Sequence, residues 1–350
     1  NGAVFQNWAQ YRLVMRYLSQ LNNRQTLVMY SGHPLGLFPA PQNAPRAVIT
    51  NGMMIPNYSK PEHWNKLNAL GVTQYGQMTA GSWMYIGPQG IVHGTTITLM
   101  EAARRKGRSA GDSIPLFVSA GLGGMSGAQP KAAKIAGMVG LIAEINPLAA
   151  RKRHEQGGVD EVCNNPEQAI QMALEAKKAA KPCSIAFLGN VTDLWEKLAA
   201  MNITPELGSD QTSLHNPFSG GYYPAGCTLE ESQEMMHREP ERFKSLVEES
   251  LRRQVHAINT LAARGMYFFD YGNAFLLEAS RAGAEVGVPG RFRYPSYIQD
   301  LMGPLYFDYG FGPFRWICSS GLPEDLQVTD RIATRVLEEL YQEAPDEIRP

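Results

Sequence analysis

The chain has 350 residues, 44% of them hydrophobic, and a formal net charge of −1 at pH 7. This length is enough for two or three domains with complete hydrophobic cores. A charge so close to zero gives no reason to expect binding to nucleic acid or to an anionic membrane, and no apolar run is long enough to span a bilayer. We therefore expect a protein that works in solution.

Four cysteines are scattered along the chain: Cys163, Cys183, Cys227 and Cys318. None forms a C-x-x-C pair or has a histidine at ligand spacing, which argues against zinc and against a disulfide scaffold. We expect no metal site and a reducing, cytoplasmic setting.

The first part of the chain has α/β character. Residues 1–19 have an apolar helical face, residues 26–30 predict a strand, residues 31–36 predict its turn, and residues 47–50 predict a second strand.

Residues 74–96 mix glycines, amides and hydroxyls with large aromatics, without a period of two or of 3.6. Two interpretations stay open, an ordered loop pressed against a ligand and a buried, turn-rich connector. We expect a helix to resume at Thr96.

A strand, a glycine turn and a helix start follow one another over residues 114–136. Gly121, Gly123 and Gly127 let the backbone turn tightly, approach a phosphate and pack the helix on the sheet. The spacing is G-x-G-x-x-x-G, because Ser126 stands where the usual third glycine would be. Alone, the pattern is also compatible with a glycine-rich loop that binds nothing.

A second strand, residues 138–144, ends in Glu144, about twenty residues after the turn, where a Rossmann unit places the acid that accepts hydrogen bonds from ribose. The combination of strand, turn, helix, strand and terminal acid predicts a dinucleotide site.

Helices and strands alternate through the rest of the chain. Helices are expected at 166–178, 194–201 and 240–264, with a capping box at Thr228, and strands at 184–188, 207–210 and 266–273. Such alternation predicts a parallel sheet with helices on both faces and ligands at the carboxyl ends of the strands. Four residues lie at these predicted ends: Gly121, Glu144, Asn190 and Gln211.

Residues 309–321 place Arg315 among aromatics and glycines. A buried arginine without a partner is costly, so an anion is expected beside it. A substrate carboxylate and a structural acid both remain possible.

Several strings together resemble the urocanate hydratase (urocanase) family over essentially the whole chain: YGQMTAGSW at 75–83, GLGGMSGAQP at 121–130, DQTSLH at 210–215, FDYGN at 269–273 and GPFRW at 312–316. The resemblance implies a hydro-lyase of histidine degradation that adds water to urocanate to give 4-imidazolone-5-propionate. It also implies tightly bound NAD that acts as an electrophile, and a cytoplasmic homodimer.

Carried over position by position, the resemblance assigns the urocanate carboxylate to Arg315 and names no catalytic residue. The cofactor contacts that it implies are Gln77, Gly124, Met125, Ser126, Glu144, Asn190, Val191, Gln211, Thr212, Ser213, Leu214, His215, Tyr222, Tyr223 and Tyr271.

The chain departs from the family pattern at two positions and in its length. An arginine that bacterial members use near the cofactor aligns with Ala149, and Arg151 or Arg153 is a candidate replacement. An extra residue near Gly220 leaves open which of Tyr222 and Tyr223 matches the family's contact. We also expect the chain to be truncated at both ends relative to the family.

The predicted fold class is α/β, with a Rossmann-like parallel-sheet NAD domain at 108–282 inserted into a second α/β core domain formed by 1–107 and 283–350. Two other functions stay open beside the hydratase. One is an NAD-dependent dehydrogenase, and the other is an NAD-binding piece without activity.

Overall fold

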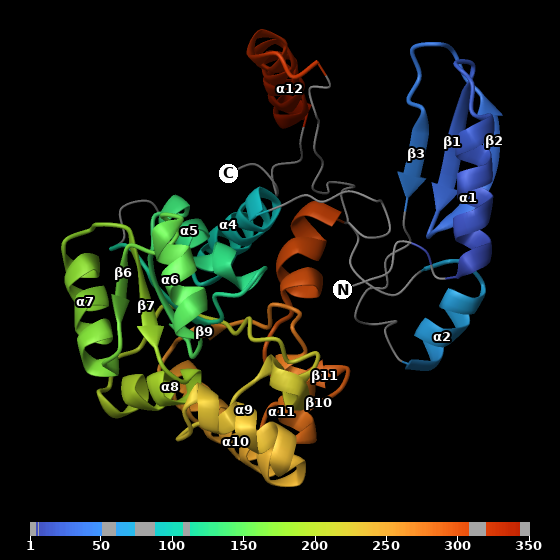
Figure 1. Cartoon of the computed structure of the whole chain (residues 1–350). Coiled ribbons are helices and arrows are strands. Elements are labelled where there is room, and N and C mark those ends of the chain that lie inside the picture. The colour runs from blue at the N-terminus through green and yellow to red at the C-terminus, as the bar shows by residue number, and fades with distance from the viewer. Residues whose placement is uncertain are drawn as a thin grey trace. The chain divides into compact units, whose positions relative to one another are not determined.

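The computed structural model describes residues 5, 7–50, 61–73, 88–107, 113–307 and 320–343. The chain divides into two compact units, Asn1–Gln89 and Gly90–Pro350. Figure 1 shows the helices and strands of the two units.

The first unit contains a three-stranded sheet in the order β2-β1-β3, in which β1 pairs antiparallel with β2 and parallel with β3. Its small core is formed by Val14, Leu27 and Met29. The elements of this unit are α1 (Trp8–Gln20), β1 (Gln25–Tyr30), β2 (His33–Pro39), β3 (Ala47–Thr50) and α2 (Pro61–Ala69).

The turn between β1 and β2 is shorter than the sequence predicts. Only Ser31 and Gly32 form it, with φ of 46° and 82°, and the strand resumes at His33. Two consecutive residues with positive φ make a tight hairpin turn whose twist matches that of the strands, so no further turn residues are needed.

The second unit is built on a six-stranded, all-parallel sheet in the order β6-β7-β5-β4-β8-β9. Leaving out the edge strand β6, this is the classic doubly wound order, and the chain reverses direction across the sheet between β4 and β8. The strands are β4 (Leu116–Ala120), β5 (Val139–Glu144), β6 (Glu161–Cys163), β7 (Cys183–Leu188), β8 (Leu207–Gly208) and β9 (Tyr267–Phe268).

Helices complete this unit, with a short hairpin of β10 (Gly287–Val288) and β11 (Arg291–Phe292). They are α4 (Pro88–Arg105), α5 (Gln129–Ile135), α6 (Pro147–Glu155), α7 (Pro166–Lys178), α8 (Val191–Ala200), α9 (Leu229–Arg238), α10 (Pro240–Ala263), α11 (Phe275–Arg281) and α12 (Pro323–Glu343). A 3₁₀ turn, η2 (Ser126–Ala128), and two π-helical segments, η3 (Pro217–Gly221) and η4 (Tyr297–Phe307), lie between them.

Side chains of the central strands alternate between two cores. Val118 of β4 and Leu141 of β5 pack with α7, α8 and α10, whereas Phe117 and Ile142 pack with α4, α5 and α6. A strand buried on both faces is expected in a parallel sheet covered by helices. The predicted α/β class with a parallel Rossmann-like sheet is therefore confirmed.

Local sequence explains four helix starts in this unit. Asn146, Asn165 and Asn190 cap α6, α7 and α8 through their side-chain oxygens, and Thr228 with Glu231 forms the predicted capping box of α9.

The helix expected from Thr96 instead begins at Pro88, because proline is favoured in the first turn, where no intrahelical N–H bond is lost. The part of the expected loop at 74–87 lies outside the described residues.

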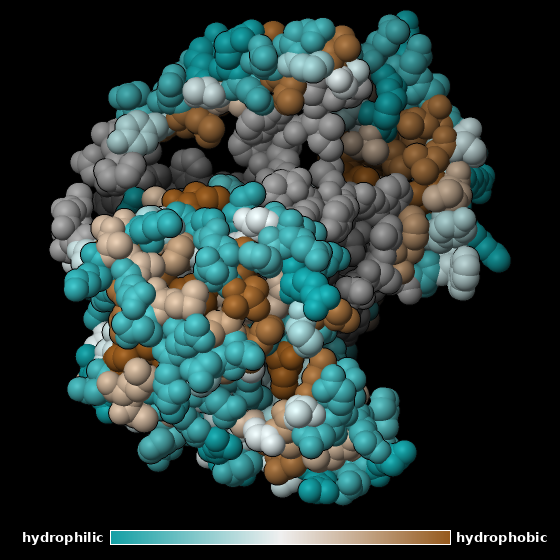
Figure 2. Space-filling view, turned by 60° about the vertical axis from the view of Figure 1, so that its left-hand side comes forward, coloured by the Kyte–Doolittle hydropathy of each residue, from teal (hydrophilic) through white to brown (hydrophobic). Residues whose placement is uncertain are grey.

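None of the helices among the described residues combines the length and the hydropathy needed to cross a membrane. Over the face shown in Figure 2, hydrophilic side chains predominate and apolar ones lie scattered between them.

Candidate functional site

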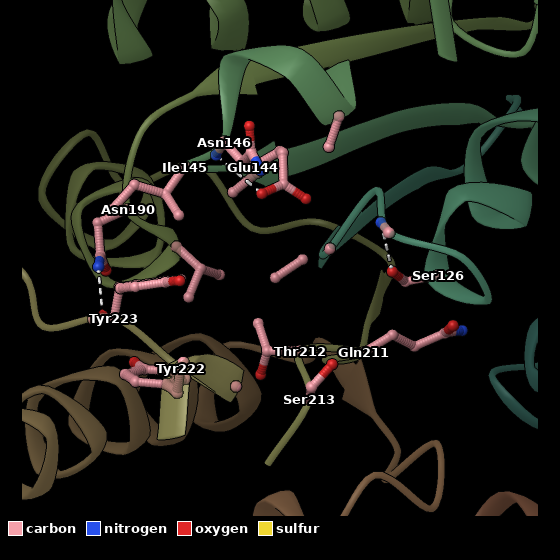
Figure 3. A pocket seen from close by; sticks show the side chains of 18 of the residues that line it. Ser126, Glu144, Ile145, Asn146, Asn190, Gln211, Thr212, Ser213, Tyr222 and Tyr223 are labelled. Carbon is pink, nitrogen blue, oxygen red and sulfur yellow. Dashed lines mark hydrogen bonds between the residues drawn. The ribbon is translucent and has the colours of Figure 1, made fainter. Parts of the chain in front are cut away.

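A cavity of ≈ 220 Å³ opens at the carboxyl ends of β4, β5 and β7, beside the segment that follows β8. This is the point where the strand order reverses, and in open α/β sheets ligands bind there. Its lining residues are Ala120, Gly121, Gly123, Ser126, Ala143, Glu144, Ile145, Asn146, Ala149, Gly189, Asn190, Val191, Gln211, Thr212, Ser213, Gly220, Gly221, Tyr222 and Tyr223. In Figure 3, Glu144 and Asn146 lie on one side of the space, and Thr212 and Ser213 lie across from them.

The glycine turn after β4 forms one wall. Gly121 has φ +94°, and a Cβ there would lie 2.8 Å from both the carbonyl oxygen of Gln211 and Oγ of Ser126. Ser126 itself accepts a hydrogen bond from the Gly123 N–H at 2.9 Å, shown in Figure 3. Glycine is therefore required at position 121 both for the backbone angle and for the close approach.

Gly127 does not serve the close packing of helix on sheet that the sequence predicts for it. A side chain there would clash with Arg153, which donates from Nε to the Leu122 carbonyl at 3.1 Å and from Nη2 to the Gly123 carbonyl at 2.7 Å. The close approach of helix to sheet occurs instead at Gly140, where a Cβ would meet that of Ala133 at 3.0 Å. Of the two candidate arginines, Arg153 is thus the one that holds the turn.

Glu144 lies at the end of β5, as predicted. Its Oε2 accepts from the Leu122 N–H at 2.6 Å and its Oε1 from the Asn146 N–H at 2.9 Å. Burial raises the pKa of this carboxyl, while the hydrogen bonds from Asn146 and Leu122 act in the opposite direction. The acid is thereby fixed beside the glycine turn.

Asn190 joins two parts of the wall. Its Oδ1 accepts from the Thr192 N–H and caps α8, while its Nδ2 donates to the Tyr223 carbonyl at 2.8 Å (Figure 3). The turn that includes Gly220, with φ +84°, brings Tyr222 and Tyr223 back to the cavity.

The structure gathers most of the predicted cofactor residues around this cavity. Those that line it are Ser126, Glu144, Asn190, Val191, Gln211, Thr212, Ser213, Tyr222 and Tyr223. Both candidate tyrosines are included.

Other predicted residues lie elsewhere. Gly124 and Met125 sit on the exposed side of the turn, Leu214 is buried in the core, and His215 is exposed. Tyr271 is bonded to Thr95 at 2.6 Å and its ring stacks on Tyr297 with centroids 4.7 Å apart. Gln77, Arg315 and Cys318 lie outside the described residues. The cofactor roles of Gln77, Gly124, Met125, Leu214, His215 and Tyr271 and the substrate role of Arg315 stay predictions.

Asn146 is a lining residue that sequence reasoning missed. It is followed by Pro147 and comes directly after a strand that ends in an acid. An Asn-Pro pair at such a place is a helix start signal, since asparagine caps and proline begins the helix. That signal would have placed Asn146 at the mouth of the cavity.

The residues present fit a dinucleotide. A tight glycine turn, a carboxylate fixed at the end of the next strand and capped helix starts surround a cavity at the reversal point of a doubly wound sheet. The fold and site define a Rossmann-like dinucleotide-binding protein.

Comparison with known proteins makes this more specific. Residues 87–301 match the urocanase Rossmann-like domain, residues 1–84 the urocanase N-terminal domain and residues 304–347 the urocanase C-terminal domain. The chain belongs to the urocanase family, whose members use tightly bound NAD.

Individual relatives support the family assignment. The chain is 58% identical over 348 residues to "Urocanate hydratase" of Homo sapiens and 59% identical over 348 residues to "Probable urocanate hydratase" of Caenorhabditis elegans. A "Probable urocanate hydratase" of Dictyostelium discoideum is 57% identical over 345 residues. In each case 97% of this chain is covered but only 51% of the relative, so the chain spans about half the length of these proteins.

Proposed function

We propose that this chain is the cofactor-binding part of a urocanate hydratase, which adds water to urocanate to give 4-imidazolone-5-propionate. The observation that carries the proposal is the cavity at the β4–β8 reversal point, lined by the Gly121 turn and Glu144, in a chain 58% identical to a protein named urocanate hydratase. The activity requires both a dinucleotide site and a substrate site beside it.

The chain's own residues would hold NAD in this cavity. The backbone of the turn from Gly121 to Ser126 approaches the phosphates, and Glu144 accepts hydrogen bonds from ribose hydroxyls with its remaining lone pairs. Thr212 and Ser213 supply hydroxyls on the opposite wall. When bound, NAD supplies an electron-poor ring that draws electron density from the substrate's imidazole.

Arg315 would bind the urocanate carboxylate. A guanidinium offers a fork of parallel N–H donors that matches a carboxylate, which fixes the orientation of the substrate as well as its affinity. The protein thus contributes chiefly placement and electrostatics.

The proposal is tested by following the loss of urocanate absorbance with the purified protein and with Arg315→Ala. We expect kcat/KM to fall by about two orders of magnitude or more, since losing one partner of a buried charge pair costs roughly 2–5 kcal/mol. Arg331→Ala on the exposed face of α12 is the matched control and should leave turnover unchanged.

Two outcomes would replace the proposal. Production of NADH from a hydroxyl substrate, without loss of urocanate, would identify a dehydrogenase. Retention of NAD with no turnover of urocanate would identify an NAD-binding piece without activity.

The remaining expectations are part of the same proposal. They are a cytoplasmic homodimer and a division in which 108–282 form the NAD domain and 1–107 with 283–350 form the core domain. The family resemblance supports them, and sedimentation of the purified protein tests the dimer.

A further inference from the structure

A row of buried polar side chains lies behind the wall of the cavity, and Gln254 stands in its middle. This residue belongs to α10, does not line the cavity and is 0% exposed. Its Nε2 donates to Oδ2 of Asp210 at 2.9 Å, and its Oε1 accepts from the hydroxyl of Tyr222 at 2.6 Å. One amide thus joins the segment after β8 to the segment after η3.

Asp210 fixes which way this amide points. The carboxyl is 1% exposed, and besides Gln254 its Oδ1 accepts from the Thr212 N–H at 2.9 Å, the Thr212 hydroxyl at 2.5 Å and Nδ2 of Asn273 at 2.8 Å. All of these partners are donors, so they match an acceptor-only carboxylate. The amide must therefore present its NH₂ to Asp210 and its oxygen to Tyr222.

The donor and acceptor roles fixed at Asp210 also determine the roles of the hydroxyls of Tyr222 and Thr192. Because the Tyr222 hydroxyl donates to Gln254, the hydroxyl of Thr192 at 3.0 Å is its donor. The Thr192 N–H bonds to Oδ1 of Asn190, whose amide holds the Tyr223 carbonyl. At its two ends the row bonds to Thr212 and includes Asn190, and both of these residues line the cavity.

The helix that carries Gln254 is well anchored. Phe243, Val247 and Leu251 of α10 are buried in the main core. Arg253 makes a two-point ion pair with Glu196 of α8, at 2.9 Å and 2.7 Å. Ser250, one turn before Gln254, accepts from the Ala225 N–H at 2.9 Å. Because α10 is rigidly packed, a side chain on it can position the loops to which it bonds.

We propose that Gln254 is a positioning residue of the cofactor site, which through Asp210 and Tyr222 sets the spacing of three lining segments: Asn190–Val191, Gln211–Ser213 and Tyr222–Tyr223. The inference rests on the proposed function for the identity of the ligand, but not for the hydrogen-bond network itself. A buried amide with both ends bonded to loops tolerates only one arrangement of those loops.

The first test is the affinity of the cofactor-free protein for NAD, measured by calorimetry. Gln254→Leu removes the donor to Oδ2 of Asp210 and the acceptor of the Tyr222 hydroxyl. We expect the affinity to fall by about tenfold or more, since buried polar groups that lose a hydrogen-bond partner are costly. Gln171→Leu removes an amide that bonds Glu175 on the exposed face of α7 and should change nothing.

A paired exchange makes the test specific. Gln254→Glu alone places two carboxylates face to face and should weaken NAD binding at least as much as Gln254→Leu. Adding Asp210→Asn restores complementarity, because the new amide donates to the new carboxylate and its oxygen still accepts from Thr212 and Asn273. The double variant should therefore recover most of the affinity. It provides a test even if Gln254→Leu does not fold.

Amide hydrogen exchange in the absence of NAD provides the readout that is independent of the ligand. In Gln254→Leu, exchange should accelerate over residues 211–225 and remain as in the wild type over residues 121–129. If the wild type binds no NAD at all, the proposed function is wrong. The exchange pattern then still tests whether Gln254 fixes the position of residues 211–225.

Two results would overturn the inference. One is a folded Gln254→Leu variant that is less stable but has unchanged NAD affinity and unchanged exchange over 211–225. The other is a double variant that binds no better than Gln254→Glu.

Discussion

The two walls of the cavity are held in different ways. The wall after β4 is fixed mainly by backbone groups, because Arg153 and Gln129 donate to carbonyls of residues 120–123 and Glu144 accepts from the Leu122 N–H. The wall after β8 is fixed by side chains that bond to one another, with Asp210, Gln254 and Tyr222 at its centre. The first wall is held by side chains bonded to its backbone from up to 31 residues away, and the second depends on Gln254, which lies 44 residues after Asp210.

The largest effect is expected at the first wall. Gly121→Ala puts a side chain at φ +94° and within 2.8 Å of the Gln211 carbonyl and of Ser126 Oγ. We expect a loss of unfolding free energy of about 1–3 kcal/mol from the backbone strain, with the clash in addition.

Urea unfolding of the cofactor-free protein measures this loss. Gly124→Ala is the matched control in the same turn, since a Cβ there meets nothing within 4 Å. Equal stability of the two variants would mean that the turn is not held as described.

This contrast explains what the sequence could predict. The glycine turn and Glu144 at the end of its strand are local patterns, so the strands, the parallel sheet and much of the first wall were predictable. The start of α8 was not predicted correctly, since the helix begins at Val191 after its cap Asn190 and not at Leu194. In the sequence, Gln254 is indistinguishable from any other polar residue of a long amphipathic helix. Its meeting with Asp210 and Tyr222 depends on tertiary packing, which no local period encodes.

Local rules also failed in informative places. Gly127 fits the expected role of close helix–sheet packing by its spacing, yet it makes room for Arg153, which comes from α6. The start of α4 at Pro88 was missed because glycines and aromatics around it hide the helical period. At Gly127 the deciding residue, Arg153, is distant in sequence. At α4 a single proline, Pro88, sets where the helix begins.

The second wall should be broken by Tyr222→Phe. This change removes the hydroxyl that donates to Gln254 and leaves a buried amide oxygen unsatisfied, at a cost of roughly 1–3 kcal/mol. Tyr223→Phe, at a half-buried neighbour, is the control for stability. Thermal unfolding distinguishes them, and an equal shift of Tm in both variants would contradict the network.

A smaller effect is expected from Arg153→Lys. A lysine keeps the charge but loses the fork that reaches the Leu122 and Gly123 carbonyls together, so we expect a loss of about 1 kcal/mol in the partly exposed setting. Arg151→Lys, at an exposed position, should be neutral in the same urea titration. If Arg151→Lys is the more damaging change, the assignment of the turn's arginine is wrong.

The last effect concerns the pH dependence of stability, at Asp270 after β9. Burial raises the pKa of Asp270 from 3.8 to about 6. A raised pKa in the folded state means that this carboxyl destabilises the fold progressively as pH rises from about 4 to about 6. The stability of Asp270→Asn relative to the wild type should therefore increase across this range, and a difference that does not change with pH would contradict the shift.

We infer that the cavity between the two walls binds NAD. Its most direct test is to denature the purified protein, quantify the NAD released per chain, and repeat this after incubation with added NAD for the wild type and Gly121→Ala. We expect near-stoichiometric NAD in the wild type and strongly reduced NAD in the variant. A wild type that carries no NAD, even after incubation, would contradict it.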